Sequence, residues 1–166
     1  MNKKNSVIKD LLEVTISAAL IAFLLTKLVL IPVVVEGSSM EPNLAENDRG
    51  FSFVISKNIT VSRFDIVVVH IGKGHNIVKR VIGMPGETVC FRDNSLYIDG
   101  VYQDEPFLGD VNTGDFDITL KDDEYYCLGD NRDVSIDSRY YGPFTKEDFL
   151  SSHILVLYPF NRIGWH

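Results

Sequence analysis

The chain has 166 residues, of which 45% are hydrophobic, and 16 basic against 23 acidic residues give a formal net charge of −7. This length fits one domain with at most a small appendage, and the acidic balance argues against a nucleic-acid partner, which would require a basic face. Two cysteines, Cys90 and Cys127, are too few for a disulfide scaffold. We interpret them as small apolar strand residues, with one bridge as the alternative if the domain lies outside the cytosol.

The first element expected along the chain is a transmembrane helix. Residues 11–32 read LLEVTISAALIAFLLTKLVLIP, which is about the length that crosses a bilayer. Glu13 can stay at the headgroups, Lys27 can extend its stem to the far interface, and Pro32 disfavours further helix. Because this segment is apolar on every face, a buried core helix of a soluble protein is a poor alternative.

The basic start of the chain is also typical of a secretory signal peptide. Lys3, Lys4 and Lys9 precede the apolar segment, but no small-x-small cleavage site with a polar mature start follows it. An uncleaved anchor is therefore predicted, with residues 1–10 in the cytoplasm. Residues 33–166 would form the extracytoplasmic domain of a single-pass plasma-membrane protein.

The rest of the chain contains short β-branched and aromatic runs separated by Gly, Pro, Asn and Asp, which predicts a mainly β domain with an antiparallel sheet. The expected strands are 50–55, 65–70, 76–82, 87–92, 95–98, 124–128 and 154–158. Residues 93–103 (DNSLYIDGVYQ) suggest a hairpin. One short helix is expected over 145–151, with Thr145 as its N-cap and Asp148 three residues later, and residues 108–121 are expected to be a loop.

The segment VEGSSMEPNL (Val35–Leu44) places a serine where a tight turn could present it to a substrate at the bilayer surface. Gly37 permits a sharp turn, Pro42 makes the exit rigid, and Met40 is an adaptable apolar contact next to Ser39. Taken alone, Gly-Ser-Ser-Met is more commonly just a turn.

A lysine lies inside the strand-like run NIVKRVIGMPGE (Asn76–Glu87). Strand alternation places Lys79 on the same face as Ile77 and Val81. Burial lowers the pKa of a lysine, and a neutral lysine can accept the proton of a serine hydroxyl. The alternative is an exposed lysine that protects a sheet edge.

The third polar segment is GDNRDVSIDSR (Gly129–Arg139). Such a dense set of charges could form a buried ion-pair network that supports the wall of an active site. A polar surface loop is the alternative, since loops carry most such stretches.

Together these three segments resemble the type I signal peptidases, particularly their compact Gram-positive form. The apolar DIVVV (Asp65–Val69) also matches an intervening strand of that family, and the resemblance covers nearly the whole chain. It implies that Ser39 is the nucleophile, with its own backbone amide in the oxyanion hole, that Lys79 is the general base, and that Ser135 orients the lysine. The residues implied to form a structural polar network are Asp130, Asn131, Arg132, Asp137 and Arg139.

The resemblance further implies a serine endopeptidase that removes N-terminal signal peptides from exported preproteins delivered by the export machinery. No metal or other cofactor is implied, and a monomer is expected. Two small residues, one and three before the cleaved bond, would enter an apolar pocket. The residues expected to line this pocket are Val33, Val35, Met40, Leu44 and Val78.

Three positions depart from the family pattern. Asn43 stands where Thr is usual, Phe64 stands where Gly is common, and Gly37 lacks the hydroxyl that some relatives carry as an oxyanion donor. The alternatives are a self-cleaving repressor, which would need a DNA-binding domain, a catalytically silent membrane-tethered binding domain, and a specialised pilin- or sortase-associated peptidase.

Overall fold

The computed structural model describes residues 3–54, 60–72, 74–109 and 111–166, with the side chains of 3–8 and 24–29 left out. The expected strand 50–55 is present as β2 (Arg49–Val54), and its last residue, Ile55, lies outside the described residues.

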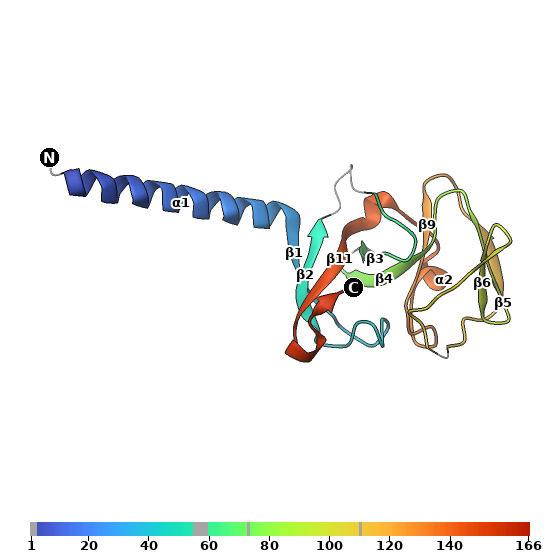
Figure 1. The fold of residues 1–166 in the computed structure, drawn as a ribbon. Coiled ribbons are helices and arrows are strands. Elements are labelled where there is room, and N and C mark those ends of the chain that lie inside the picture. The colour runs from blue at the N-terminus through green and yellow to red at the C-terminus, as the bar shows by residue number, and fades with distance from the viewer. Residues whose placement is uncertain (1–2, 55–59, 73, 110) are drawn as a thin grey trace.

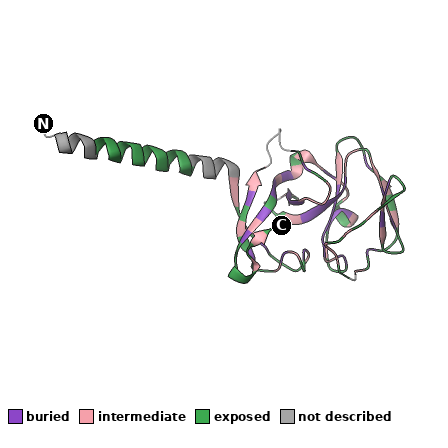
Figure 2. Cartoon of the chain, viewed as in Figure 1, coloured by how far each residue is buried: buried purple, intermediate pink, exposed green. Residues whose placement is uncertain are grey.

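Helix α1 (Lys3–Val29) projects away from the β domain, and its described side chains are exposed (Figures 1 and 2). Within the described residues, no helix is both long enough and apolar enough to cross a membrane, so the expected transmembrane helix over 11–32 is not confirmed. The expected helix ran to Pro32, but α1 ends at Val29, because Leu30–Val34 form strand β1. Pro32 is tolerated there because β1 lies at the edge of its sheet.

The rest of the chain is mainly β, as predicted. The strands after β2 are β3 (Ile66–His70), β4 (Asn76–Gly83), β5 (Thr88–Arg92), β6 (Ser95–Ile98), β7 (Val101–Gln103), β8 (Phe116–Thr119), β9 (Glu124–Leu128), β10 (Phe144–Thr145), β11 (Phe149–Tyr158) and β12 (Gly164–Trp165). Short helices are α2 (Ser138–Tyr141), η1 (Lys146–Asp148) and η2 (Phe160–Arg162).

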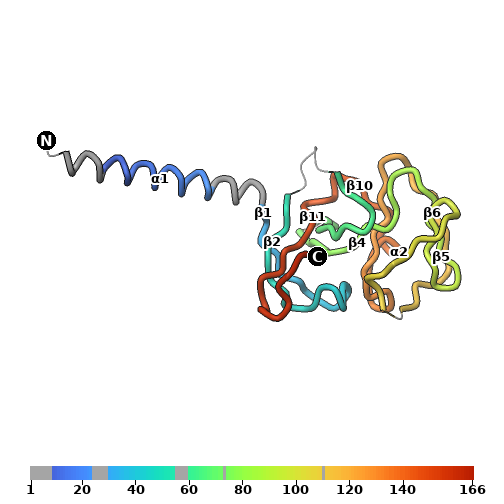
Figure 3. The backbone as a smooth tube through the Cα atoms, in the orientation of Figure 1, coloured from blue at the N-terminus to red at the C-terminus, as the bar shows by residue number. Residues whose placement is uncertain are grey.

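These strands form two antiparallel sheets. The larger has the order β1-β2-β11-β3-β4-β9-β10, with β12 paired to β11, and the smaller has the order β7-β6-β5-β8. Strand β11 joins elements far apart in sequence, since it pairs with both β2 and β3. The backbone trace in Figure 3 shows β1, β2 and β11 side by side where α1 enters the domain.

Three apolar clusters hold the sheets together. One packs the small sheet on β4 and β9 and includes Val89, Phe91 and Leu128. A second joins the serine segment to β3 and β11. A third lies around Val67, Val81 and Phe149. The serine segment is therefore part of the core of the larger sheet.

Two local predictions are wrong in part. The expected loop 108–121 contains strand β8, which pairs with β5 and packs Phe116 against Phe91 and Tyr126. The expected helix 145–151 is only the 3-10 turn η1, although Thr145 and Asp148 do form the expected capping box. Strand β11 begins immediately at Phe149 because this ring packs on Tyr125 and its backbone pairs with β3.

Candidate active site

Ser39 lies on the turn that connects β1 to β2. Gly37 has a φ of 78°, a left-handed conformation that favours glycine. The Asn131 N–H donates to the Ser39 carbonyl at 3.0 Å. A Cβ atom at Gly129 would collide with the Ser135 side chain and the Ser39 carbonyl. The third polar segment therefore packs directly on the serine turn.

Lys79 reaches this turn from the middle of β4. Its side chain is buried, with only 2% of the residue exposed, and its Nζ donates to Ser39 Oγ at 2.8 Å. Burial lowers the pKa of Lys79 to about 8, although the carboxylates of Asp137 and Asp130 oppose this shift. A large fraction of the amine is therefore neutral at slightly alkaline pH and can accept a proton.

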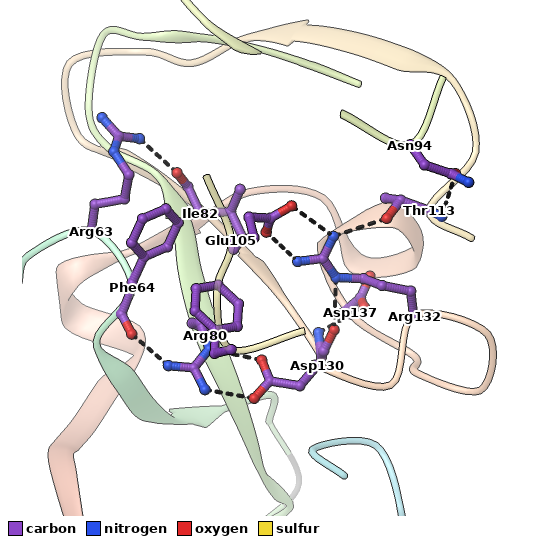
Figure 4. A network of polar contacts seen from close by, with 12 residues as sticks. Arg63, Phe64, Arg80, Ile82, Asn94, Glu105, Thr113, Asp130, Arg132 and Asp137 are labelled. Carbon is purple, nitrogen blue, oxygen red and sulfur yellow. Dashed lines mark hydrogen bonds and ion pairs between the residues drawn. The ribbon is translucent and has the colours of Figure 1, made fainter. Parts of the chain in front are cut away.

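The residue after the lysine forms a buried ion pair that also involves the serine turn. Arg80 contacts Asp130 through two hydrogen bonds of 2.8 and 2.6 Å and donates to the Phe64 carbonyl, as Figure 4 shows. Asn43 donates to the same Asp130 carboxylate at 2.9 Å and to the Phe107 carbonyl at 2.8 Å. Asp130 therefore joins the lysine strand to the serine turn.

Arg132 connects the third polar segment to the residues between β7 and β8 of the small sheet. It pairs with Glu105 at 2.5 Å and donates to Thr113 Oγ1 and to the Gly129 carbonyl (Figure 4). Its guanidinium group also lies over the Phe91 ring, 5.3 Å from the centroid.

Asp137 and Arg139 form a third ion pair behind the site. Although burial opposes the shift, hydrogen bonds from Arg139 and from the Gly129 N–H hold the pKa of Asp137 below its usual value. Ser135 Oγ is buried, and its interaction with the Asp137 carboxylate also lowers the pKa of Asp137. In the described part of the chain no hydrogen bond joins Ser135 to Lys79, so its role in orienting the lysine stays a prediction.

Two adjoining cavities open beside the dyad. One, of about 310 Å³, is lined by Ser39 and Lys79 together with Val34, Val35, Glu36, Met40, Gly74, His75, Asn76, Ile77 and Val78. The other, of about 140 Å³, shares Val34, Asn76 and Val78 with the first and also contacts Val33. Four of the five expected pocket residues thus line a cavity. Leu44 is instead fully buried in the cluster behind them.

Several residues of the network were not predicted from the sequence, among them Arg80, Thr113, Asn43 and Glu105. Asn43 was noted only as a departure from the family pattern, and Glu105 was not noted at all. Only a structure could place Glu105 beside Arg132, since 27 residues separate them.

Cys90 and Cys127 are both free, so the alternative of a disulfide bridge is not realised. Burial raises the pKa of the Cys127 thiol far above its usual value, which makes it a packing residue.

Known proteins are similar to this chain over most of its length. The family model "Signal peptidase, peptidase S26" matches residues 8–158. Signal peptidase I of Bacillus amyloliquefaciens is 37% identical, with 96% of this chain and 93% of that protein covered. Signal peptidase IB of Staphylococcus aureus (strain MRSA252) is 33% identical, with 95% of each covered.

A solved structure agrees with these sequences. The crystal structure of a signal peptidase I from Enterococcus faecalis is 35% identical, has a TM-score of 0.53, and covers 57% of this chain and 97% of that one. With a family match over nearly the whole length and relatives well above 30% identity, this chain belongs to the signal peptidase I family of serine-type peptidases, which cleave signal peptides from preproteins.

Proposed function

We propose that this chain removes signal peptides by a Ser-Lys mechanism in which Ser39 is the nucleophile and Lys79 is the general base. The observation that supports this most is the 2.8 Å hydrogen bond between Lys79 Nζ and Ser39 Oγ, made by a buried lysine whose pKa is lowered to about 8. Nucleophile and base within hydrogen-bonding distance are the signature of such a pair.

In this mechanism Lys79 carries the Ser39 hydroxyl proton to the leaving group. Neutral Lys79 takes the Ser39 hydroxyl proton as Oγ attacks the carbonyl carbon of the substrate. The lysine then gives that proton to the departing amine, and an ester forms on Ser39. Water hydrolyses the ester with Lys79 again acting as the base, which restores the free serine.

The Ser39 backbone N–H is the proposed oxyanion donor. It forms no hydrogen bond to another described residue, which leaves it available for a substrate oxygen. Gly37 carries no hydroxyl that could assist it. Asn131 and Asp130 hold the turn in place through the Ser39 carbonyl and the Asn43 amide.

The free edge of β1 is the proposed docking site of the substrate. Val35 uses both its N–H and its carbonyl for residues 47 and 48, on the side of β2. The N–H and carbonyl groups of Val34 and Glu36 therefore point to the open side, where an extended preprotein can add as a further strand. Small side chains one and three residues before the cleaved bond would then enter the cavity beside Val33, Val35 and Val78.

We also propose that residues 11–32 associate with the lipid bilayer, with residues 33–166 as the catalytic domain outside the cytoplasm. The described large apolar residues of α1 are more than half exposed, and exposed apolar and aromatic residues also occur near the other end of the chain, at Tyr158, Phe160, Ile163 and Trp165. Recovery of the full-length chain in the supernatant of carbonate-washed membranes would contradict this part. Delivery by the export machinery and a monomeric state stay predictions.

The test of the mechanism is cleavage of a preprotein in detergent by wild type, Ser39→Ala and Lys79→Ala. We expect cleavage by wild type alone, and activity that rises with pH through about 8 as Lys79 loses its proton. Full processing by either variant would reject the assignment. Labelling of wild type but not Ser39→Ala by a serine-directed acylating probe would identify the nucleophile directly.

A further inference from the structure

The cavity at the dyad carries one acidic side chain for which the proposed mechanism has no use. Glu36 is exposed, lines this cavity with Ser39 and Lys79, and its side chain forms no hydrogen bond or ion pair to another described residue. An unpaired charge at the wall of a substrate cleft can select for the opposite charge in the substrate.

The face on which Glu36 lies determines which substrate residue it meets. Val33 and Val35 lie on the face of the strand that packs into the buried cluster. Val34, which is 53% exposed, and Glu36 alternate with them and lie on the opposite face. The strand therefore has an apolar face and a face that ends in a carboxylate.

A substrate strand added to this edge continues the pleat of the sheet. Its side chains share a face with their cross-strand neighbours. If the two small residues of the cleavage motif follow the face of Val33 and Val35, the residue between them follows the face of Val34 and Glu36. Since that residue does not enter the apolar pocket, a long charged side chain can be accommodated there.

We propose that Glu36 makes this enzyme prefer a positively charged residue at the middle position of the cleavage motif, between the two small residues. This inference rests on the proposed function and adds a specificity to it. The other titratable groups that line the cavity within the described residues are His75 and Lys79. At a pH about one unit above the Lys79 pKa of about 8, the Lys79 amine is mostly neutral, so its positive charge no longer offsets the negative charge of Glu36 on this cavity wall.

The test uses three peptides that differ only at the middle position, which carries Arg, Gln or Glu between two alanines. At low ionic strength we expect kcat/KM to fall from Arg to Gln to Glu by about two- to fivefold per step, the size of a cross-strand charge pair. The differences should shrink at high salt because both partners are exposed.

Variants assign this preference to Glu36. Glu36→Gln is expected to give nearly equal kcat/KM values for the three peptides, and Glu36→Lys is expected to favour the Glu peptide. Glu46→Gln is the matched control, since Glu46 is exposed on the following loop and lines neither cavity at the dyad. It should keep the wild-type order.

The outcomes separate this inference from the mechanism. Cleavage of all three peptides by wild type at equal rates, or a charge preference that persists in Glu36→Gln, would overturn the role of Glu36 and leave the Ser-Lys mechanism intact. If wild type cleaves none of the three peptides faster than Ser39→Ala does, both the role of Glu36 and the Ser-Lys mechanism are overturned.

Discussion

The two sheets of this chain differ in what they bury. The larger sheet buries Lys79 and Arg80 on β4, and the buried Asp130 lies two residues after the end of β9. The residues that the smaller sheet buries against β4 and β9 are Val89, Phe91, Leu96 and Ile98, and no buried charge lies on its described strands. Buried charge is thus concentrated around the serine turn, where it costs stability, and the apolar sheet supplies stability without taking part in the chemistry.

Ion pairs join the two regions, and one of them involves the third polar segment. Glu105 follows β7 of the small sheet and pairs with Arg132, whose guanidinium group also lies over Phe91 of β5. The small sheet therefore supports the third polar segment from behind. We therefore expect substitutions near the dyad to affect activity most, and the effects to decrease toward the exposed face of the small sheet.

The largest expected effect is that of Lys79→Met. Loss of the proposed base should reduce kcat/KM by at least about 10⁴-fold.

Burial of Lys79 also makes stability depend on pH. The folded-state pKa of about 8 lies below the ordinary value of 10.5, so the folded chain binds fewer protons than the unfolded chain between these values. Wild-type stability therefore rises with pH across this window.

The same variant tests the cost of burying that charge. Below pH 8 the free energy of unfolding of Lys79→Met should exceed that of wild type by at most roughly 3 kcal/mol. This difference should vanish above pH 10.5. Denaturation curves at several pH values measure this. A variant less stable than wild type at every pH would contradict the interpretation of Lys79 as a costly buried amine.

Asp130→Ala should have the largest effect on stability. It leaves Arg80 buried and unpaired and also removes the acceptor of Asn43, so we expect a loss of about 3–5 kcal/mol in the free energy of unfolding. The double variant Arg80→Met with Asp130→Ala is the control, because it leaves no unpaired buried charge. If it loses as much as the single variant, the ion pair is not the cause.

Glu105→Gln removes one of the ion pairs between the sheets and should have an intermediate effect. Arg132 would keep its bonds to Thr113 and Gly129 but lose a charged acceptor, at a cost of roughly 1–3 kcal/mol. Thermal unfolding gives the stability, and peptide cleavage gives the activity. Equal activity with lower stability would show that the small sheet supports the fold but not the position of Ser39.

Asp117→Asn should have the smallest effect. Asp117 pairs with Arg92 on the small sheet at 3.6 Å, and both side chains are about half exposed or more. Such pairs contribute little, so we expect a change within about 0.5 kcal/mol and unaltered kcat/KM. A large change would mean that the exposed face of the small sheet influences the site, and that the two sheets are not divided into a chemical and a supporting part.

Local sequence patterns predicted most of the strands, because alternation and turn residues are visible within each short segment. The alternation in residues 76–82 and the turn residues around 93–103 specify strand and hairpin without reference to the rest of the chain. The β8 strand was missed because its FDIT is short and lies among Gly, Asp and Thr. Its partner β5, about 25 residues earlier, decides its conformation.

By itself the sequence determined the family, the mainly β class and the residue types of the proposed dyad. These follow from motifs, and a motif is a property of neighbouring residues. The tertiary structure alone decided that Lys79 Nζ lies 2.8 Å from Ser39 Oγ, that Asn43 and Arg80 share the Asp130 carboxylate, and that Glu36 lies at the cavity beside the dyad. Distance and burial depend on how segments far apart in the chain pack, and burial is what lowers the pKa of Lys79.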